Sequence, residues 1–153
     1  MFTKILIANR GEIAVRIIRA CKEMGAASVA VYSEADRETL HTALADESIC
    51  IGPASASDSY LNAERIISAA LATGAAAIHP GYGFLSENRD FAELCEKNGI
   101  AFIGPSAATM KSLSDKAESK KLMKEAGLPV IPGTEALSGV EEALKEAEDI
   151  GYP

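Results

Sequence analysis

The sequence predicts an α/β protein with a doubly wound, mostly parallel β-sheet. Short apolar runs alternate with stretches whose apolar residues recur at helical spacing, and glycine closes several of these stretches. The apolar runs lack the alternation of a half-exposed strand, so we expect them to be buried on both faces, as strands of a parallel sheet are. The 153 residues, 48% of them hydrophobic, suffice for one ordinary core and a small appendage.

A strand–helix–strand unit is expected at the start of the chain. Residues 4–8 form an apolar run of β type, and the turn at residues 9–11 separates it from a helix that ends at Gly25. A second strand, residues 28–32, follows at once, which is typical of a βαβ unit. The residues of this helix that we expect to face the core are Ile13, Ile17, Ala20, Cys21 and Met24.

The same alternation is expected to continue through residue 103. Ser86 is predicted to be an N-cap, and Gly74 and Gly99 are predicted to end their helices. In the helix before Gly74, the residues expected to face the core are Leu61, Ile66, Ile67 and Ala70. The predicted elements are a helix at 40–45, a strand at 48–51, a helix at 60–73, a strand at 75–78, a helix at 87–97 and a strand at 100–103.

The character of the sequence changes after Pro105, and we predict two domains, residues 1–112 and residues 113–153. The segment 111–124 is rich in lysine and is expected to be helical.

A last helix is expected through Ala147. Ser138 and Glu141 have the spacing of a capping box at its start. Because the helix leads into Gly151-Tyr152-Pro153, we expect a further strand to follow, so the second domain is expected to be incomplete.

Composition excludes several classes of function. The net charge of -7 disfavours nucleic-acid binding, and no apolar run approaches the roughly 20 residues that cross a bilayer, so no membrane association is expected. We expect no targeting segment and a cytoplasmic location. The cysteines are odd in number and far apart, which is typical of reduced core residues and not of a zinc site; they are Cys21, Cys50 and Cys95.

Two turns follow predicted strands, where α/β proteins place ligands. Asn9-Arg10-Gly11-Glu12 has one glycine where a dinucleotide-binding turn needs three, so a structural turn is the simpler interpretation. The second turn has the spacing Gly81-x-Gly83-x-x-Ser86, which could hold an anion at a helix start. The alternative is a tight turn in which Phe84 and Leu85 pack under the sheet.

Single residues indicate little on their own. His79 is expected to be a hydrogen-bonded structural histidine, because no acidic residues surround it at metal-ligand spacing. Lys116 opens a helix, where a phosphate could bind, although lysines in so basic a helix are most often solvated. Arg16, Arg19 and Glu23 share one face of the first helix, which on its own indicates an ion-paired surface.

Together these motifs resemble a biotin carboxylase, and the resemblance covers the whole chain. The resemblance implies a Rossmann-like domain that precedes an ATP-grasp domain, followed by the opening helices of that ATP-grasp domain. The motifs that carry the resemblance are Ile7–Ala14, Ala35-Asp36-Arg37, Ala45-Asp46-Glu47, His79–Asn88, Phe102–Pro105 and Ser114-Asp115-Lys116.

The resemblance also implies an activity. The parent enzyme would use MgATP and bicarbonate to form carboxyphosphate, and the CO2 would then pass to N1 of biotin on a biotin carboxyl carrier protein. A carboxyltransferase would be a further partner, and an acetyl-CoA carboxylase is the expected type. The metal-binding and catalytic residues of the family would lie beyond this sequence, so the chain alone is expected to be inactive, with no metal site and no catalytic residue of its own.

Site residues follow from the same resemblance. Lys116 would contact ATP, although Ser114 stands where many members of the family have glycine. Tyr82 and Gly83 would lie near biotin, with Gly81 allowing the loop to approach closely. The positions that would lie at the contact between the two protomers of a homodimer are Arg16, Arg19 and Glu23.

Two other functions remain open. The chain could be a non-catalytic α/β module that binds a nucleotide or a partner protein. A nicotinamide-dependent enzyme is disfavoured, because the glycine fingerprint is missing and no acidic residue obviously closes a strand to bind a ribose.

Overall fold

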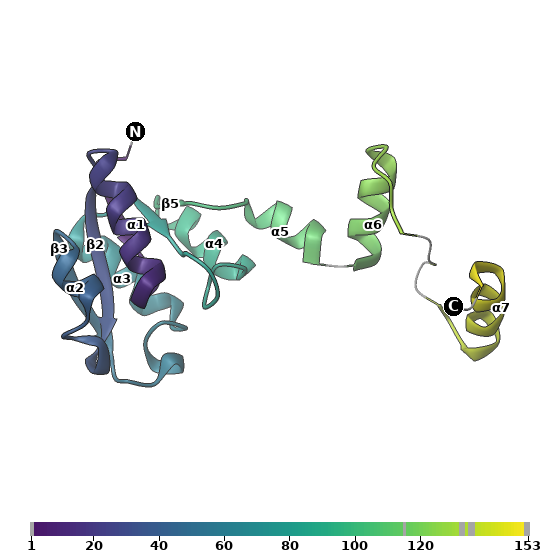
Figure 1. The fold of residues 1–153 in the computed structure, drawn as a ribbon, viewed down its shortest axis with the longest axis horizontal. Helices are drawn as coiled ribbons and strands as arrows, with labels where there is room; N and C mark the ends of the chain where they lie inside the picture. Colours follow the sequence, from purple (N-terminus) through teal and green to yellow (C-terminus); the bar gives the residue numbers. More distant parts are fainter. Residues whose placement is uncertain (1, 115, 132–133, 135–136, 152–153) are drawn as a thin grey trace. The chain divides into compact units, whose positions relative to one another are not determined.

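The computed structural model describes residues 2–114, 116–131, 134 and 137–151. The chain divides into two compact units, residues 1–110 and residues 111–153, and Figure 1 shows the elements of each. The domain boundary that we predict after residue 112 remains a proposal.

The first unit contains a five-stranded parallel sheet, which confirms the predicted fold class. Its strand order is β3-β2-β1-β4-β5, and every pair of neighbouring strands is parallel. From β1 the chain moves to one side of the sheet for two strands and then crosses to the other side, so β1 and β4 flank the point where the order reverses. The strands are β1 (Lys4–Ile7), β2 (Ala27–Ser33), β3 (Glu47–Gly52), β4 (Ala77–His79) and β5 (Ala101–Phe102).

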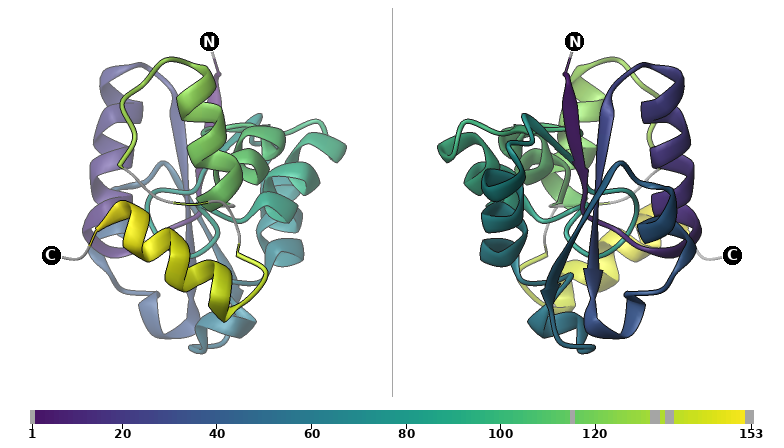
Figure 2. Two further views of the ribbon diagram at one scale, coloured as in Figure 1. Left: turned by 90° about the vertical axis from the view of Figure 1, so that its right-hand side faces the viewer. Right: turned by 90° about the vertical axis from the view of Figure 1, so that its left-hand side faces the viewer.

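Helices cover both faces of this sheet. Apolar residues of α1 (Gly11–Glu23) and the end of α2 (Leu40–Leu44) pack against one face, beside Ile5 and Ile7. On the other face, α3 (Ala63–Thr73) and α4 (Arg89–Lys97) bury the larger cluster. Figure 2 shows these helices on opposite sides of the strands. Short 3-10 turns, Glu34–Asp36 and Ala56–Asp58, follow β2 and β3.

The buried face of α1 differs from the predicted one. Cys21 is buried as expected, but Ile13 and Ile17 are only half-buried, and Ala20 and Met24 are exposed. The helix carries two overlapping apolar series, and the one with smaller side chains faces the sheet. The buried residues are Ala14, Val15, Ile18 and Cys21.

Two helices begin later than predicted. Asn88, not Ser86, is the N-cap of α4, because its Oδ1 accepts a hydrogen bond from the Phe91 N–H at 2.8 Å. Ser86 is used inside the preceding turn, where its N–H donates to the carbonyl of Gly83. Asn62 caps α3 in the same way. Leu61 lies before that cap and is exposed, although Ile66, Ile67 and Ala70 are buried as predicted.

The outermost strand β3 is not buried on both faces. Glu47, Ser48 and Cys50 are exposed, because this strand forms the edge of the sheet and pairs only with β2 among the described residues. The expectation that all strands are buried and that all cysteines lie in the core is therefore wrong here. Cys21 and Cys95 are buried, and burial raises the pKa of the Cys95 thiol to about 11.

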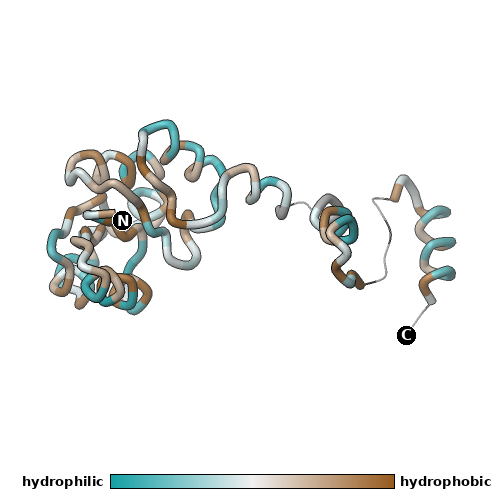
Figure 3. The backbone as a smooth tube through the Cα atoms, turned by 90° about the horizontal axis from the view of Figure 1, so that it is seen from above, coloured by the Kyte–Doolittle hydropathy of each residue, from teal (hydrophilic) through white to brown (hydrophobic). Residues whose placement is uncertain are grey.

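The second unit is helical. The lysine-rich segment divides between α5 (Ala107–Ser114), which starts in the first unit, and α6 (Lys116–Glu125). The last helix, α7 (Val140–Ile150), starts one residue after the N-cap Gly139, so its capping contact joins Ser138 to Glu142 and not to Glu141. Figure 3 shows hydrophobic and hydrophilic residues alternating along α7. Among the described residues, no helix is long and apolar enough to span a membrane.

Candidate functional site

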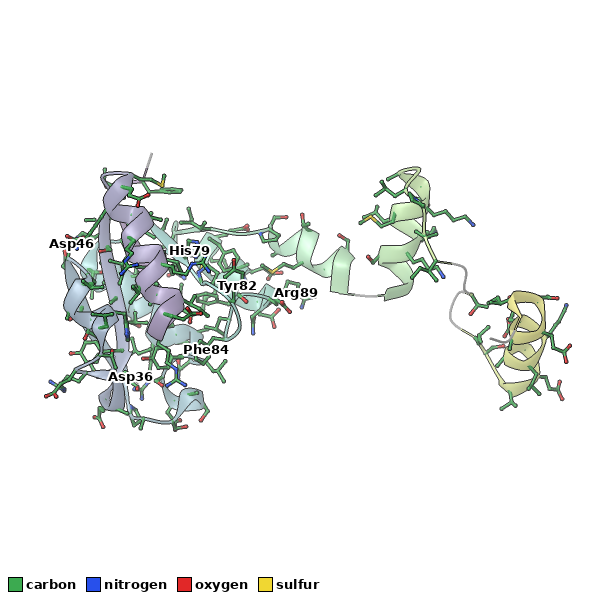
Figure 4. The ribbon with its side chains drawn as sticks, in the orientation of Figure 1. Asp36, Asp46, His79, Tyr82, Phe84 and Arg89 are labelled. Carbon is green, nitrogen blue, oxygen red and sulfur yellow. The ribbon has the colours of Figure 1, made fainter. Side chains whose placement is uncertain are left out.

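The loops that follow β1 and β4 lie side by side at the carboxyl edge of the sheet. Because β4 pairs directly with β1, with Ile7 opposite His79, the turn at residues 9–11 meets the loop at residues 79–88. This is the point of the sheet where the strand order reverses, and ligands of doubly wound folds bind there. Figure 4 shows His79, Tyr82 and Phe84 along the second loop. We call residues 79–84 the glycine loop.

Asn9 ties the two loops together. Its side-chain Nδ2 donates hydrogen bonds to the carbonyls of Pro80 and Tyr82, each at 2.8 Å, and its Oδ1 accepts one from the N–H of Arg10 at 2.9 Å. The residue is 2% exposed. A buried amide costs free energy unless its donors and acceptor are used, and here both donors and the acceptor are used. The first turn therefore holds the glycine loop in place.

Gly81 fits this contact because it has no side chain. Its φ is +66°, in the left-handed region, and a Cβ there would lie 2.7 Å from Cγ2 of Ile13 and 2.8 Å from Nδ2 of Asn9. Its N–H donates to Nδ1 of His79 at 3.1 Å. Burial lowers the pKa of His79, which favours the neutral ring that can accept this bond. His79 is thus a hydrogen-bonded structural histidine, as predicted.

Replacing each of the two glycines of the loop by alanine distinguishes the cost of a left-handed backbone from the cost of a steric clash. Gly83 also has a positive φ, +69°, but a Cβ there would meet nothing within 4 Å. Gly83→Ala is expected to lower the free energy of unfolding by about 1–2 kcal/mol, the cost of a left-handed alanine. Gly81→Ala is expected to cost about 1–3 kcal/mol more, because its Cβ would collide with Asn9. Urea unfolding of both variants measures the difference, and equal losses would contradict the close contact.

Phe84 completes the loop in an unusual backbone conformation. Its φ is +45°, and it is the one residue other than glycine with a positive φ among those the structure describes. Its ring stacks on Tyr60 with centroids 5.1 Å apart, and the Arg10 guanidinium lies 5.6 and 5.8 Å from the ring centroids of Tyr60 and Phe84. Leu85 is buried in the core. The packing of Phe84 and Leu85 agrees with the tight-turn interpretation of this loop.

The anion-binding alternative for the loop loses its structural basis. It required Ser86 at a helix start, but α4 begins only at Arg89. The N–H of Ser86 is already bonded to Gly83. The helix that follows the spacing Gly81-x-Gly83-x-x-Ser86 therefore does not begin at Ser86.

Asp36 links the 3-10 turn that follows β2 to the side chains of Arg10 and Tyr60. Its Oδ2 accepts hydrogen bonds from the Tyr60 hydroxyl at 2.7 Å and from Ser33 Oγ at 3.0 Å, and it lies 3.4 Å from Nη1 of Arg10. Burial alone would raise the pKa of Asp36, but the hydrogen bonds from Tyr60 and Ser33 and the charge of Arg10 outweigh it and hold the pKa below its usual value. The lowered pKa favours the ionised carboxylate, whose Oδ2 contacts all three partners.

Asp46 lies at the opposite end of the sheet, directly before β3 and beside the start of β2. Its Oδ2 accepts hydrogen bonds from the N–H and the hydroxyl of the buried Ser28, at 2.8 and 2.7 Å. These bonds lower the pKa of Asp46 and fix the turn before β3. Its contacts are therefore structural.

The comparisons with known proteins agree with this architecture. Residues 1–110 match the family described as biotin carboxylase, N-terminal domain. The chain belongs to the biotin carboxylase family. Residues 115–153 match the ATP binding domain of the carbamoyl-phosphate synthase L chain.

Individual relatives match along the whole chain. Biotin carboxylase 1 of Bacillus subtilis is 56% identical over all of this chain, which covers 34% of that protein. The small subunit of 2-oxoglutarate carboxylase from Hydrogenobacter thermophilus is 55% identical over all of this chain, which covers 32% of it. The solved biotin carboxylase domain of a thermophilic 2-oxoglutarate carboxylase, bound to bicarbonate, has a TM-score of 0.93 and 55% identity, with all of this chain and 34% of that one covered. The chain thus spans about a third of the length of these relatives.

The biotin carboxylase motifs occupy both units. Tyr82 is 73% exposed, although its backbone carbonyl is held by Asn9, and Gly83 is exposed beside it. Lys116 is the first residue of α6, in the second unit, and its side chain lies outside the described part of the structure. Arg16, Arg19 and Glu23 are exposed on the side of α1 away from the sheet. The roles that the family resemblance implies for these residues remain proposals.

Sequence reasoning missed the residues that build the support of the site. Asn9, Asp36 and Asp46 lie in the motifs of the biotin carboxylase resemblance, but no role could be given to them. Tyr60 lies in none of these motifs, and only its burial and its hydroxyl contacts reveal it. Among residues 2–114, 116–131, 134 and 137–151, no three His, Cys, Asp or Glu side chains gather in a way that could hold a metal ion.

Proposed function

We propose that this chain is the N-terminal part of an ATP-dependent biotin carboxylase. The parent enzyme uses MgATP and bicarbonate to carboxylate biotin on a biotin carboxyl carrier protein. The observation that carries the proposal is the order of the two family matches, a biotin carboxylase N-terminal domain at residues 1–110 and an ATP-binding domain at residues 115–153. The bicarbonate bound to the similar 2-oxoglutarate carboxylase domain supports bicarbonate as a substrate.

Each unit contributes a different part of the substrate contacts. Tyr82 and Gly83 lie near the biotin ring, where an exposed aromatic ring on a fixed loop offers an apolar surface to a flat ligand. Lys116 contacts ATP, because a lysine in the first turn of a helix adds its charge where the helix already favours anions. The chain supplies positioning and binding, and the chemical step depends on residues that follow it in the longer relatives.

The parent is proposed to be a free-standing biotin carboxylase subunit of an acetyl-CoA carboxylase. It forms a homodimer and works with a separate carboxyltransferase. This chain covers 34% of Bacillus subtilis biotin carboxylase 1, so that relative is only about three times as long as this chain. Such a length supports a separate biotin carboxylase subunit over a much longer multifunctional protein. The similar small subunit of 2-oxoglutarate carboxylase belongs to an enzyme with a different acceptor. Assays of the reconstituted complex with acetyl-CoA, pyruvate and 2-oxoglutarate distinguish these parents. The proposed contacts across the dimer include Arg16, Arg19 and Glu23.

Release of ADP tests the proposed activity. We expect no ADP release that depends on biotin and bicarbonate from the 153-residue chain, and measurable release from the full-length protein that contains it. The physical reason is that transition-state charge in phosphoryl transfer must be neutralised by cationic groups and metal ions. The biotin carboxylase resemblance implies that the residues providing them follow this chain in the longer relatives, of which it covers about a third. Turnover by the short chain would contradict the assignment of the chemistry to later residues.

A non-catalytic binding module remains the alternative. It is favoured if the full-length protein binds ATP but releases no ADP with biotin and bicarbonate present. Equilibrium binding of ATP, measured on the same preparation as the ADP assay, separates the two functions.

A further inference from the structure

The contacts of Asn9 give it a part in the reaction beyond folding. We propose that Asn9 is a positioning residue that fixes the backbone of Tyr82 and thereby the place of its ring at the biotin site. This inference rests on the proposed function, because it takes Tyr82 to be the aromatic residue near biotin. It adds a residue that makes no contact with substrate and acts through the backbone of the glycine loop.

The hydrogen bonds of Asn9 bracket the turn of the loop. Its two N–H groups reach the carbonyls of Pro80 and Tyr82, which lie on either side of Gly81. Both distances are 2.8 Å, and the third bond, from the N–H of Arg10 to Oδ1, fixes which way the amide points. A reversed amide would place an oxygen against two carbonyl oxygens. The side chain therefore has one orientation and holds the loop on both sides of its turn.

The loop on the other side of this contact carries an exposed ring. Asn9 is 2% exposed, whereas Tyr82 is 73% exposed. Gly81 lies directly against the Asn9 amide, so the loop cannot shift toward the first turn. Beyond Tyr82 the loop is fixed again by the stacking of Phe84 on Tyr60. An exposed aromatic ring on a backbone held from both sides is preorganised to meet a ligand.

Asn9→Asp is the sharpest test, and it uses the full-length protein. The carboxylate has nearly the same shape and still accepts the bond from Arg10, but it turns an oxygen toward the carbonyls of Pro80 and Tyr82. We expect the KM for free biotin to rise about 10- to 100-fold, because small displacements of a positioning group have effects of that order. The KM for ATP is expected to stay within about twofold of the wild-type value, because residues that do not contact one another influence each other's binding free energies by only about 0.5 kcal/mol or less.

Asn62→Asp is the matched control. It makes the same chemical change at the N-cap of α3, where the side chain only accepts a hydrogen bond, from the N–H of Arg65. Aspartate caps helices as well as asparagine does, so no change in either KM is expected. A similar rise of the KM for biotin in Asn62→Asp would overturn the inference.

A double-mutant cycle with Tyr82→Ala shows whether Asn9 acts through Tyr82. If it does, the double variant has the KM for biotin of Tyr82→Ala alone. If Asn9 only stabilises the fold, its variants contain less folded enzyme and keep both KM values, and if Asn9 affects biotin binding independently of Tyr82, the two effects on the KM for biotin multiply. Asn9→Ala, which removes the donors without a charge, replaces Asn9→Asp in the cycle if the latter does not fold.

The outcomes separate this inference from the proposed function. A wild-type protein without ADP release that depends on biotin overturns the proposed function itself. An active wild-type protein whose Asn9 variants keep a normal KM for biotin overturns only the positioning role. A rise confined to biotin and absent in the Tyr82→Ala background supports it.

Discussion

Lys116→Ala in the full-length protein is expected to raise the KM for ATP about 10- to 100-fold. A hydrogen bond from a charged group contributes about 1.5–3 kcal/mol, and each 1.4 kcal/mol is a factor of ten in affinity. Lys116 begins α6, a helix of ten residues, and the match to an ATP-binding domain starts at residue 115. A lysine at this point adds its charge to the partial positive charge of the helix end. Steady-state ADP release at varied ATP concentration measures the change.

Lys121→Ala is the control for this prediction. Lys121 is exposed on the same helix, five residues further along, and therefore on a different face. Its removal changes the net charge by the same amount, but we expect the KM for ATP to stay unchanged. Lys116→Arg keeps the charge and is expected to retain part of the affinity. Equal effects of Lys116→Ala and Lys121→Ala would show that general charge, and not a specific contact, governs binding.

The fold was predictable because its determinants are local and repeated. Apolar runs such as residues 28–32 have the length and continuity of buried parallel strands, and the glycines after the helices mark their ends. The structure confirms the parallel sheet with helices on both faces. Periodicity could not choose between the two apolar series of α1, because both have helical spacing and share Cys21, and only the structure shows that Ala14 and Ile18 are the buried ones.

Capping residues were harder to place. Ser86 and Asn88 are both able to cap a helix, and the choice depends on how far the turn after the glycine loop extends. At α7 the capping contact moved from Glu141 to Glu142, because the helix starts one residue later. Such shifts of one or two residues depend on competing turns that a periodic pattern does not distinguish.

The support of the candidate site was least predictable. The pattern of the sequence indicates that the turn at residues 9–11 and the glycine loop both follow strands, but the strand order that brings them together is known only from the sheet. The bond from Asn9 to Tyr82 joins residues 73 positions apart, and the bond from Tyr60 to Asp36 joins residues 24 positions apart. Contacts at such separations leave no periodic trace, so geometry alone reveals them.

Tyr60→Ala is expected to lower the free energy of unfolding by about 3–5 kcal/mol, the usual cost of removing a large buried aromatic side chain. Tyr60 is 1% exposed and packs in the main core, where it also supports the ring of Phe84. Its hydroxyl accepts a hydrogen bond from the N–H of Ser33 at 3.0 Å and donates one to Asp36 at 2.7 Å. Urea unfolding followed by circular dichroism measures the loss.

Tyr60→Phe separates the hydroxyl from the ring. This variant keeps the stack on Phe84 but leaves the buried N–H of Ser33 without its acceptor, so we expect a loss of about 1–3 kcal/mol. A loss as large as that of Tyr60→Ala would mean that the hydroxyl contacts, and not the packing of the ring, account for the contribution of Tyr60. A loss near zero would contradict the hydrogen bond to Ser33.

The pH dependence of stability tests the same contacts independently. Burial, and then the hydrogen bond to Asp36, raises the pKa of Tyr60 from 10.0 to about 12. The folded state therefore holds the phenol proton more tightly than the unfolded state does, which stabilises the fold. This contribution to the free energy of unfolding is fully present below about pH 10 and is lost as the pH rises toward about 12. Wild-type protein is expected to lose more stability than Tyr60→Phe over that range. Parallel curves for the two proteins would show that the hydroxyl is not held as the contacts with Asp36 and Ser33 require.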